Sequence, residues 1–159
     1  MRGLAVNPAN QGKQLEMMID YANVQYRIRN EAVITKVPTP WKVSYDRKTG
    51  RVRYAFPDKD HPKQVDYTGH SRGVPVAFDA KSTKVKTRFD LKNIEAEQMR
   101  FLKDWLNDGG VSFLLIEFES YGEFYCVPFD WVYAYWEDAE SGGRKSIPYK
   151  EFRPEWRAK

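Results

Sequence analysis

The chain has 159 residues, of which 42% are hydrophobic, 15% aromatic and 30% charged, with a formal net charge of +4. This length fits a single domain over 1–159, and the composition excludes a disordered chain. No apolar run reaches the roughly 18 residues of a membrane span, the first sixteen residues lack the apolar stretch of a secretory signal, and the single cysteine excludes an intramolecular disulfide. We therefore expect a cytoplasmic globular domain with no membrane association.

Three elements are predicted in the first half of the chain. Apolar residues at helical spacing predict an amphipathic helix over 12–29, followed by a short strand over 33–37 that ends at Pro38-Thr39-Pro40. Alternating apolar residues over 41–56 then predict a two-stranded ribbon, with arms 41–45 and 52–56 joined by the turn 46–50. A polar connector over 57–63 follows.

The second half predicts a sheet with a further helix. Period-2 alternation indicates a strand over 74–81, followed by a basic loop over 81–90 and a helix over 93–105. Mostly apolar runs predict a central strand over 111–118 and a shorter strand over 123–127. Residues 130–136 fit a helix or an aromatic strand equally well. The order of elements implies an α/β fold with a mixed sheet flanked by helices.

Acidic residues and one lysine form the candidate chemical site. On a strand over 74–81, alternation places Asp79 and Lys81 on one face, and Asp66 can approach them from the preceding strand or turn. Hydrolysis of a phosphodiester with magnesium needs a few converging carboxylate ligands. A nearby lysine can orient the attacking water or offset charge on the phosphate. These three residue types match that chemistry.

Each of these residues also has a simpler explanation. The pair Asp79 and Lys81 is most often a solvated strand face, and Asp66 before Tyr67-Thr68-Gly69 is a common turn former. Gln98 lies on the apolar stripe of its helix, where its amide needs a partner in a metal site or at a strand end. The simplest interpretation of Glu16 is an exposed glutamate on a helix.

Basic and aromatic side chains interleave in two places, as they do on surfaces that bind phosphates and stack on bases. The ribbon and the loop after Lys81 carry Trp41, Lys42, Tyr45, Arg47, Lys48, Arg51, Arg53, Lys84, Lys86 and Arg88. The alternative for the ribbon is an amphipathic hairpin packed on the domain. Both interpretations fit the pattern of the ribbon equally well.

The ordered set of motifs resembles the RecU-type Holliday-junction resolvases, a branch of the PD-(D/E)xK nuclease superfamily found in Gram-positive bacteria and some of their phages. The resemblance extends over about 12–147. It rests on Gly12-Lys13-Gln14-Leu15-Glu16, Pro38-Thr39-Pro40, Asp66-Tyr67-Thr68-Gly69, Phe78-Asp79-Ala80-Lys81, the segment 83–89, Gln98 and Gly143-Arg144-Lys145-Ser146-Ile147.

The resemblance implies a restriction-endonuclease-like mixed central sheet flanked by helices, with a protruding two-stranded stalk inserted at about 41–63. It implies Asp66, Asp79 and Gln98 as ligands of Mg²⁺, for which Mn²⁺ substitutes, and Lys81 as the residue that stabilises the transition state. Glu16 joins the catalytic candidates. Asp79 stands where the family usually has glutamate, and Gln64 where it has threonine.

The resemblance also implies a homodimer that cuts a four-way DNA junction symmetrically, in recombination and repair. Two rivals remain at this point: a related nuclease for other branched DNA, because the catalytic core does not distinguish substrates, and a non-catalytic protein that binds branched DNA. The presence of both carboxylates and Lys81 favours an enzyme.

Overall fold

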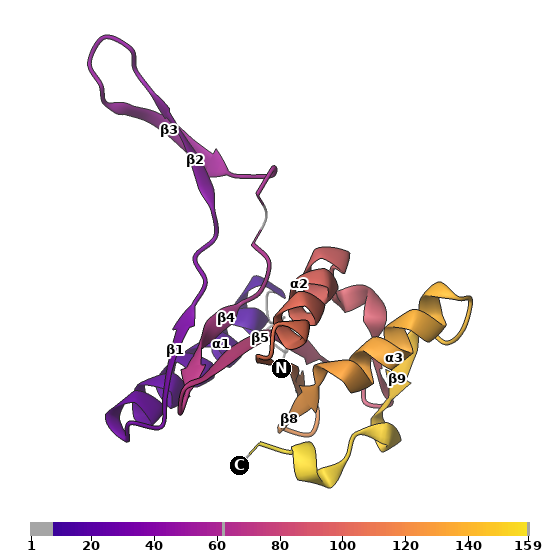
Figure 1. Ribbon diagram of the computed structural model, residues 1–159. Coiled ribbons are helices and arrows are strands. Elements are labelled where there is room, and N and C mark those ends of the chain that lie inside the picture. The colour runs from indigo at the N-terminus through magenta and orange to yellow at the C-terminus, as the bar shows by residue number, and fades with distance from the viewer. Residues whose placement is uncertain (1–7, 62, 159) are drawn as a thin grey trace, which may run out of the picture.

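The computed structural model describes residues 8–61 and 63–158, which form a mixed α/β fold with a projecting hairpin (Figure 1). The helices and strands, in chain order, are α1 (Pro8–Ile28), β1 (Ala32–Lys36), β2 (Trp41–Tyr45), β3 (Val52–Pro57), β4 (Tyr67–Ser71), β5 (Val74–Thr83), β6 (Arg88–Asp90), α2 (Ala96–Asn107), β7 (Val111–Phe118), β8 (Glu123–Pro128), α3 (Phe129–Glu140) and β9 (Ser146–Pro148). Short 3-10 helices cover Leu91–Asn93, Tyr149–Glu151 and Pro154–Trp156.

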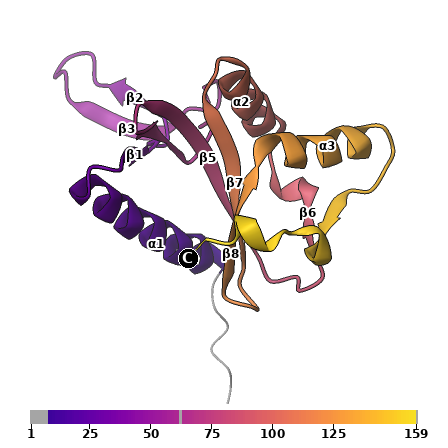
Figure 2. The ribbon, with the colours of Figure 1, turned by 60° about the horizontal axis from the view of Figure 1, so that its bottom comes forward.

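A five-stranded sheet in the order β1-β4-β5-β7-β8 forms the centre of the molecule. Strands β5 and β7 are parallel, whereas the other neighbouring pairs are antiparallel. Helix α1 covers one face, and α2 and α3 cover the other (Figure 2). The predicted restriction-endonuclease-like α/β fold, a mixed sheet flanked by helices, is confirmed.

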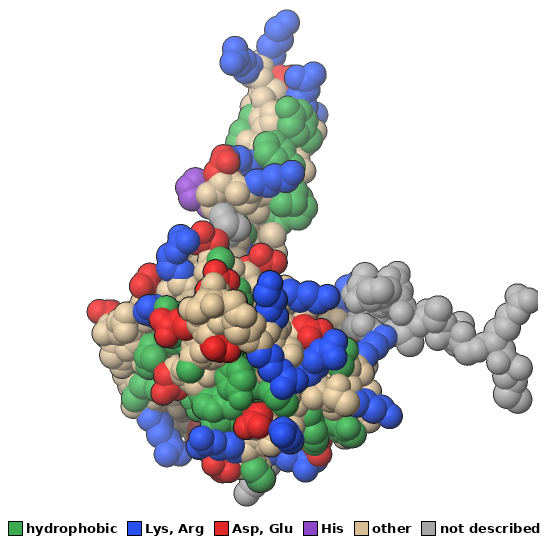
Figure 3. Space-filling model, turned by 90° about the vertical axis from the view of Figure 1, so that its right-hand side faces the viewer, with side chains coloured by type: hydrophobic (Ala, Val, Ile, Leu, Met, Phe, Trp, Pro, Cys, Tyr) green, Lys and Arg blue, Asp and Glu red, His purple; other side chains and the backbone are tan. Residues whose placement is uncertain are grey.

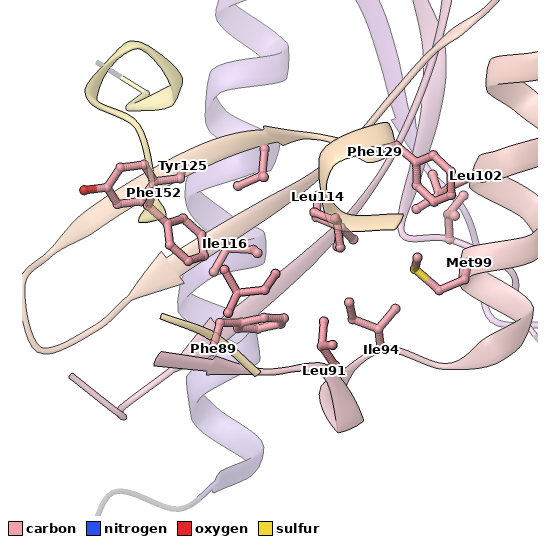
Figure 4. Close-up of a cluster of buried hydrophobic side chains, with 14 of the residues drawn as sticks. Phe89, Leu91, Ile94, Met99, Leu102, Leu114, Ile116, Tyr125, Phe129 and Phe152 are labelled. Atoms are coloured by element: carbon pink, nitrogen blue, oxygen red, sulfur yellow. The ribbon is translucent and has the colours of Figure 1, made fainter. Parts of the chain in front are cut away.

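Two hydrophobic clusters hold these layers together. The larger joins the sheet to α2, α3 and β6, with Leu114 and Ile116 in its middle and Leu102 of α2 beside Phe129 (Figure 4). The smaller lies under α1 and packs Leu15 and Ile19 against Tyr67 and Phe78. Because successive strand residues point to opposite faces, burial of Phe78 under α1 sends Asp79 to the face covered by α2.

The hairpin of β4 and β5 brings distant sequence positions together. Its turn has positive φ angles at Arg72 and Gly73, the geometry of a tight two-residue hairpin turn. Tyr67 pairs with Phe78, and the same register continued by one residue sets Asp66 opposite Asp79. Gly69 allows the backbone of β1 to approach, because a Cβ atom there would overlap the Val33 carbonyl.

Strands β2 and β3 form a separate two-stranded sheet, here called the ribbon (residues 41–57), which stands away from the rest of the molecule (Figure 1). Trp41 and Val43 share one face, Tyr54 and Phe56 share the other, and all four are exposed. The alternative of a hairpin packed on the domain is therefore wrong. The predicted protruding two-stranded stalk is confirmed.

The tip of the ribbon presents Arg47, Lys48 and Arg51, here called the tip cations, all exposed (Figure 3). Asp46 shapes this turn by accepting hydrogen bonds from the backbone N–H groups of Lys48 and Thr49, at 2.9 and 2.8 Å. Aspartate commonly stabilises turns in this way. The turn therefore directs three cations away from the domain.

Some predicted boundaries differ from the structure. The segment 81–90 is not entirely a loop, because β5 continues to Thr83 and β6 pairs with β9 through buried Phe89 and Ile147. The second helix begins at Ala96, later than predicted, after a 3-10 turn. Residues 130–136 belong to α3, which buries Phe129 and Val132 at helical spacing. None of the helices in the described residues is both long and apolar enough to cross a membrane.

Candidate active site

Asp79 lies at the centre of the candidate site, between α2 and the sheet. Its side chain is fully buried. Lys81, two residues further along β5, places its Nζ 2.8 Å from Asp79 Oδ2, and Gln98 Nε2 on α2 donates to Asp79 Oδ1 at 2.9 Å. The structure therefore brings together Asp79, Lys81 and Gln98, as strand alternation and the helical stripe predicted.

The hydrogen bonding of the Asp79 carboxylate is incomplete. Oδ2 accepts no hydrogen bond with acceptable angles from any described residue, although the Lys81 ammonium lies close to it. Burial, together with the neighbouring charge of Asp66, raises the pKa of Asp79 to about 6 against the attraction of Lys81. A buried carboxylate oxygen without a hydrogen bond is a position that a cation would stabilise.

Asp66 enters the site from the residue before β4. Its Oδ2 accepts the backbone N–H of Ala80 at 3.0 Å, and its Oδ1 lies 2.9 Å from Lys63 Nζ. Burial alone would raise the pKa of Asp66, but the Lys63 ammonium and the Ala80 N–H lower it below its usual value. Asp66 is thus held as a carboxylate beside Asp79, which holds its proton more tightly.

Gln98 has two roles in the structure. Its Oε1 accepts the backbone N–H of Glu95 at 3.0 Å, which completes a capping box at the start of α2. Its Nε2 donates to Asp79. The amide oxygen, which is the atom that ligates a metal, therefore faces the helix terminus in this structure.

Glu16 lies at the edge of the site. Its Oε2 is 2.6 Å from Lys36 Nζ at the end of β1, and its backbone carbonyl accepts the Tyr67 hydroxyl at 3.4 Å. The hydrogen bond to Glu16, its charge and those of Asp20 and Asp66 raise the pKa of Lys36. Among the described residues, Glu16 forms no hydrogen bond or ion pair with Asp66 or Asp79.

The donor atoms at this site fit a magnesium ion. No cluster of three His, Cys, Asp or Glu side chains suited to a metal occurs among the described residues. However, Mg²⁺ retains several waters and usually takes only one or two carboxylates. Asp66 and Asp79 provide those, and the unbonded Oδ2 of Asp79 is a hard oxygen.

The predicted DNA-binding residues fall into three groups. The tip cations and Trp41, Tyr45 and Arg53 are exposed on the ribbon. Lys42 instead forms ion pairs with Asp58 and Asp60 at the base of the ribbon. After β5, Lys84 and Lys86 are exposed, and Arg88 Nε lies 2.7 Å from Asp90.

Lys63 is a site residue that sequence reasoning missed. It was assigned only to the end of a polar connector, yet its side chain and that of Asp66 are each about one-fifth exposed, in direct contact. The only hint of this contact in the sequence is that Lys63 lies three residues before Asp66, because no predicted helix or strand contains both residues. The contact depends on how the connector returns from the ribbon.

Comparisons with known proteins identify one family whose model covers most of the chain. The family described as "Recombination protein U" (RecU) matches residues 10–158. A Holliday junction resolvase RecU of Oenococcus oeni is 39% identical over 143 residues, covering 87% of this chain and 72% of the relative. Proteins of the same name from Geobacillus thermodenitrificans and Lactiplantibacillus plantarum are each 37% identical, covering 93% and 90% of this chain and 75% and 70% of the relatives.

The match includes the ribbon, both carboxylates, Lys81 and Gln98. Because it covers nearly the whole chain and the relatives exceed 30% identity over most of their own length, the chain belongs to the recombination protein U family.

Proposed function

We propose that this protein is a magnesium-dependent endodeoxyribonuclease that resolves Holliday junctions, acting as a homodimer by paired symmetric hydrolysis of two phosphodiesters. The observation that carries this proposal is the buried Asp79 carboxylate, which faces Lys81 and lies opposite Asp66 on the adjoining strand. The relatives named Holliday junction resolvase support the substrate class.

Asp66 and Asp79 would hold the metal, with Gln98 joining them if its amide turns its oxygen toward the site. Magnesium, when bound, polarises the scissile phosphate and lowers the pKa of a bound water. Asp66 is already ionised, because Lys63 and the Ala80 N–H stabilise its charge. Asp79 is pre-positioned by Gln98 and by Lys81.

Lys81 is the protein's own source of positive charge at the scissile phosphate. Its ammonium lies on the same strand face as Asp79, and its side chain is 19% exposed. A partly desolvated ammonium stabilises the negative charge that builds on a phosphate during hydrolysis more strongly than one in water. Glu16 stays a catalytic candidate, with the Lys36 ion pair as its present contact.

The shape of the ribbon favours a four-way junction over a linear duplex as the substrate. It stands away from the nuclease core with exposed aromatic side chains on both faces and the tip cations at its end. A projection of this kind suits the open centre of a junction, where the faces of the branch-point base pairs are exposed to aromatic groups and phosphates attract cations. A two-fold homodimer would place two sites on two strands of like polarity.

The test is cleavage of a labelled mobile four-way junction beside linear duplex and a flap, with magnesium, manganese or EDTA. We expect paired symmetric nicks on the junction, with either metal and not with EDTA. The Asp79→Asn variant should bind the junction and leave it uncut. Binding by the wild type without any cut would favour a non-catalytic branched-DNA protein. Equal cutting of flap and junction would favour a general branched-DNA nuclease.

A further inference from the structure

A cavity of about 650 Å³ opens where the ribbon joins the nuclease core. Its lining residues come from the segment after β1, from the connector at 60–61 and 63–65, from β4 and from α2. Its apolar wall consists of Val37, Pro40, Val65, Phe101 and Trp105. None of the residues proposed to bind the metal lines it, so it is a separate feature of the molecule.

The cavity nevertheless adjoins the catalytic carboxylates. Lys63, which lines it, is the residue whose ammonium lies 2.9 Å from Asp66. Thr68, also in the lining, shares the strand face of Asp66 by alternation. On α2, Glu97 of the lining directly precedes Gln98. The cavity therefore begins one side chain away from the proposed metal position and extends toward the ribbon.

The lining provides an aromatic wall. Phe101 and Trp105 lie one turn apart on α2, with ring centroids 5.5 Å apart and an interplanar angle of 37°. Phe101 is one turn beyond Gln98, so the same face of α2 carries the contact to Asp79 and then these rings. Aromatic side chains of this kind provide stacking surfaces for planar ligands.

Polar groups surround this wall, and their charges are largely balanced. The carboxylate of Glu97 pairs with Arg100 at 3.0 Å, and that of Asp60 pairs with Lys42. Gln64 and His61 add exposed amide and imidazole groups, which can donate or accept. A planar, uncharged ligand with hydrogen-bonding edges suits such a lining, and a nucleobase has this chemistry.

The position of the cavity indicates which nucleobase of the DNA would occupy it. A strand that runs from a junction centre at the ribbon to a scissile phosphate at Asp66 and Asp79 passes over it. A base next to a branch point costs less to extrude than one within a duplex, because its stacking across the branch point is already interrupted. Enzymes that do chemistry on a base bind the extruded base by stacking and by hydrogen bonds to its edge, and the same contacts can hold a base beside a scissile phosphate.

We propose that this cavity, here called the base pocket, binds the nucleobase of the cleaved strand that adjoins the scissile phosphate on its ribbon side. Phe101 and Trp105 stack on this base, and Gln64 contacts its edge. The base pocket is thereby a determinant of where along a mobile junction the enzyme cuts. This inference rests on the proposed resolvase function.

The first test is an abasic scan of a four-way junction, in which single nucleotides around the cut site lack their base. The wild type should lose cleavage by about tenfold when the base on the ribbon side of the scissile phosphate is missing, as expected for one stacked base. Removal of other bases should have smaller effects. A flat scan in an enzyme that cuts junctions would overturn the base pocket and leave the proposed function intact.

The second test compares two variants of the base pocket with a control variant outside it. Phe101→Leu keeps an apolar side chain against the core but removes the stacking ring, and Gln64→Ala changes an exposed residue. Both should cut a mobile junction at a broader set of positions, and Phe101→Leu should lose the sensitivity to the abasic site. Tyr21→Leu, at an exposed position on α1 across the sheet from α2, is the control and should behave as wild type. Unchanged cut positions in both pocket variants would overturn the inference.

A third readout does not require cleavage. The Asp79→Asn variant should bind an intact junction about tenfold more tightly than a junction that lacks the ribbon-side base, because the base that stacks in the pocket is missing from the second DNA. The double variant Asp79→Asn, Phe101→Leu should show a smaller difference in affinity between the two junctions. An equal difference in both proteins would overturn the role of Phe101. If wild-type protein cuts no junction at all, the proposed function fails, and the base pocket fails with it.

Discussion

Replacement of Asp79 by asparagine should stabilise the metal-free protein at neutral pH relative to acid pH. Burial raises the pKa of this carboxyl from 3.8 to about 6. The folded state therefore holds the proton more tightly than the unfolded state, and the stability contributed by Asp79 falls as the pH rises from about 4 to about 6. Asparagine has no proton to lose and escapes this penalty.

The two pKa values set the size of the effect. The cost of ionising Asp79 in the folded state is about 1 kcal/mol near pH 4.5 and about 3 kcal/mol near pH 7.5. The attraction of Lys81 is already included in the pKa of about 6 and is not counted again. Replacing the carboxylic acid by an amide also shifts the stability of the variant by an amount that does not depend on pH. The free energy of unfolding of the variant minus that of the wild type should thus increase by about 2 kcal/mol between the two conditions.

The assay is urea unfolding in EDTA, followed by fluorescence of the five tryptophans. Asp104→Asn, at an exposed position on α2, is the control and should show no such increase. Magnesium should reduce the difference between Asp79→Asn and wild type near pH 7.5, because a bound cation stabilises the carboxylate. If the difference is the same at both pH values, the argument from burial of the Asp79 carboxylate is refuted.

Three further predictions test the site, the ribbon and the fold. Lys81→Met should lower the single-turnover cleavage rate by about 100-fold or more, with junction affinity in a gel-shift assay nearly unchanged. A comparable loss of affinity would make Lys81 a binding residue instead. Replacing the three tip cations by alanine should lower the affinity for a junction more than the affinity for a linear duplex. It should also reduce the slope of junction affinity against salt concentration, on logarithmic scales, by about 2 to 3. An equal loss of affinity for both DNAs would contradict the assignment of the ribbon to junction binding. Gly69→Ala should cost about 1–3 kcal/mol in urea unfolding, because the new Cβ overlaps the backbone of β1, and an unchanged midpoint would contradict the β1–β4 packing.

Local patterns were sufficient for the features that depend on neighbouring residues. The period-2 alternation of residues 74–81 placed Asp79 and Lys81 on one face, and the same rule predicted the arms of the ribbon. The helical stripe around Gln98 likewise put its amide toward the sheet. These features follow from backbone geometry over a few residues, which the order of apolar and polar side chains encodes directly.

Only the tertiary structure decided how these pieces meet. Pairing of β4 with β5 sets Asp66 opposite Asp79, and the return of the connector brings Lys63 to Asp66. The alternation of residues in the ribbon is the same whether the ribbon packs on the core or projects from it. Alternation alone therefore does not determine whether the ribbon is exposed. The pKa of Asp79 was not readable either, because desolvation depends on every side chain that packs around a carboxylate, and those come from distant parts of the chain.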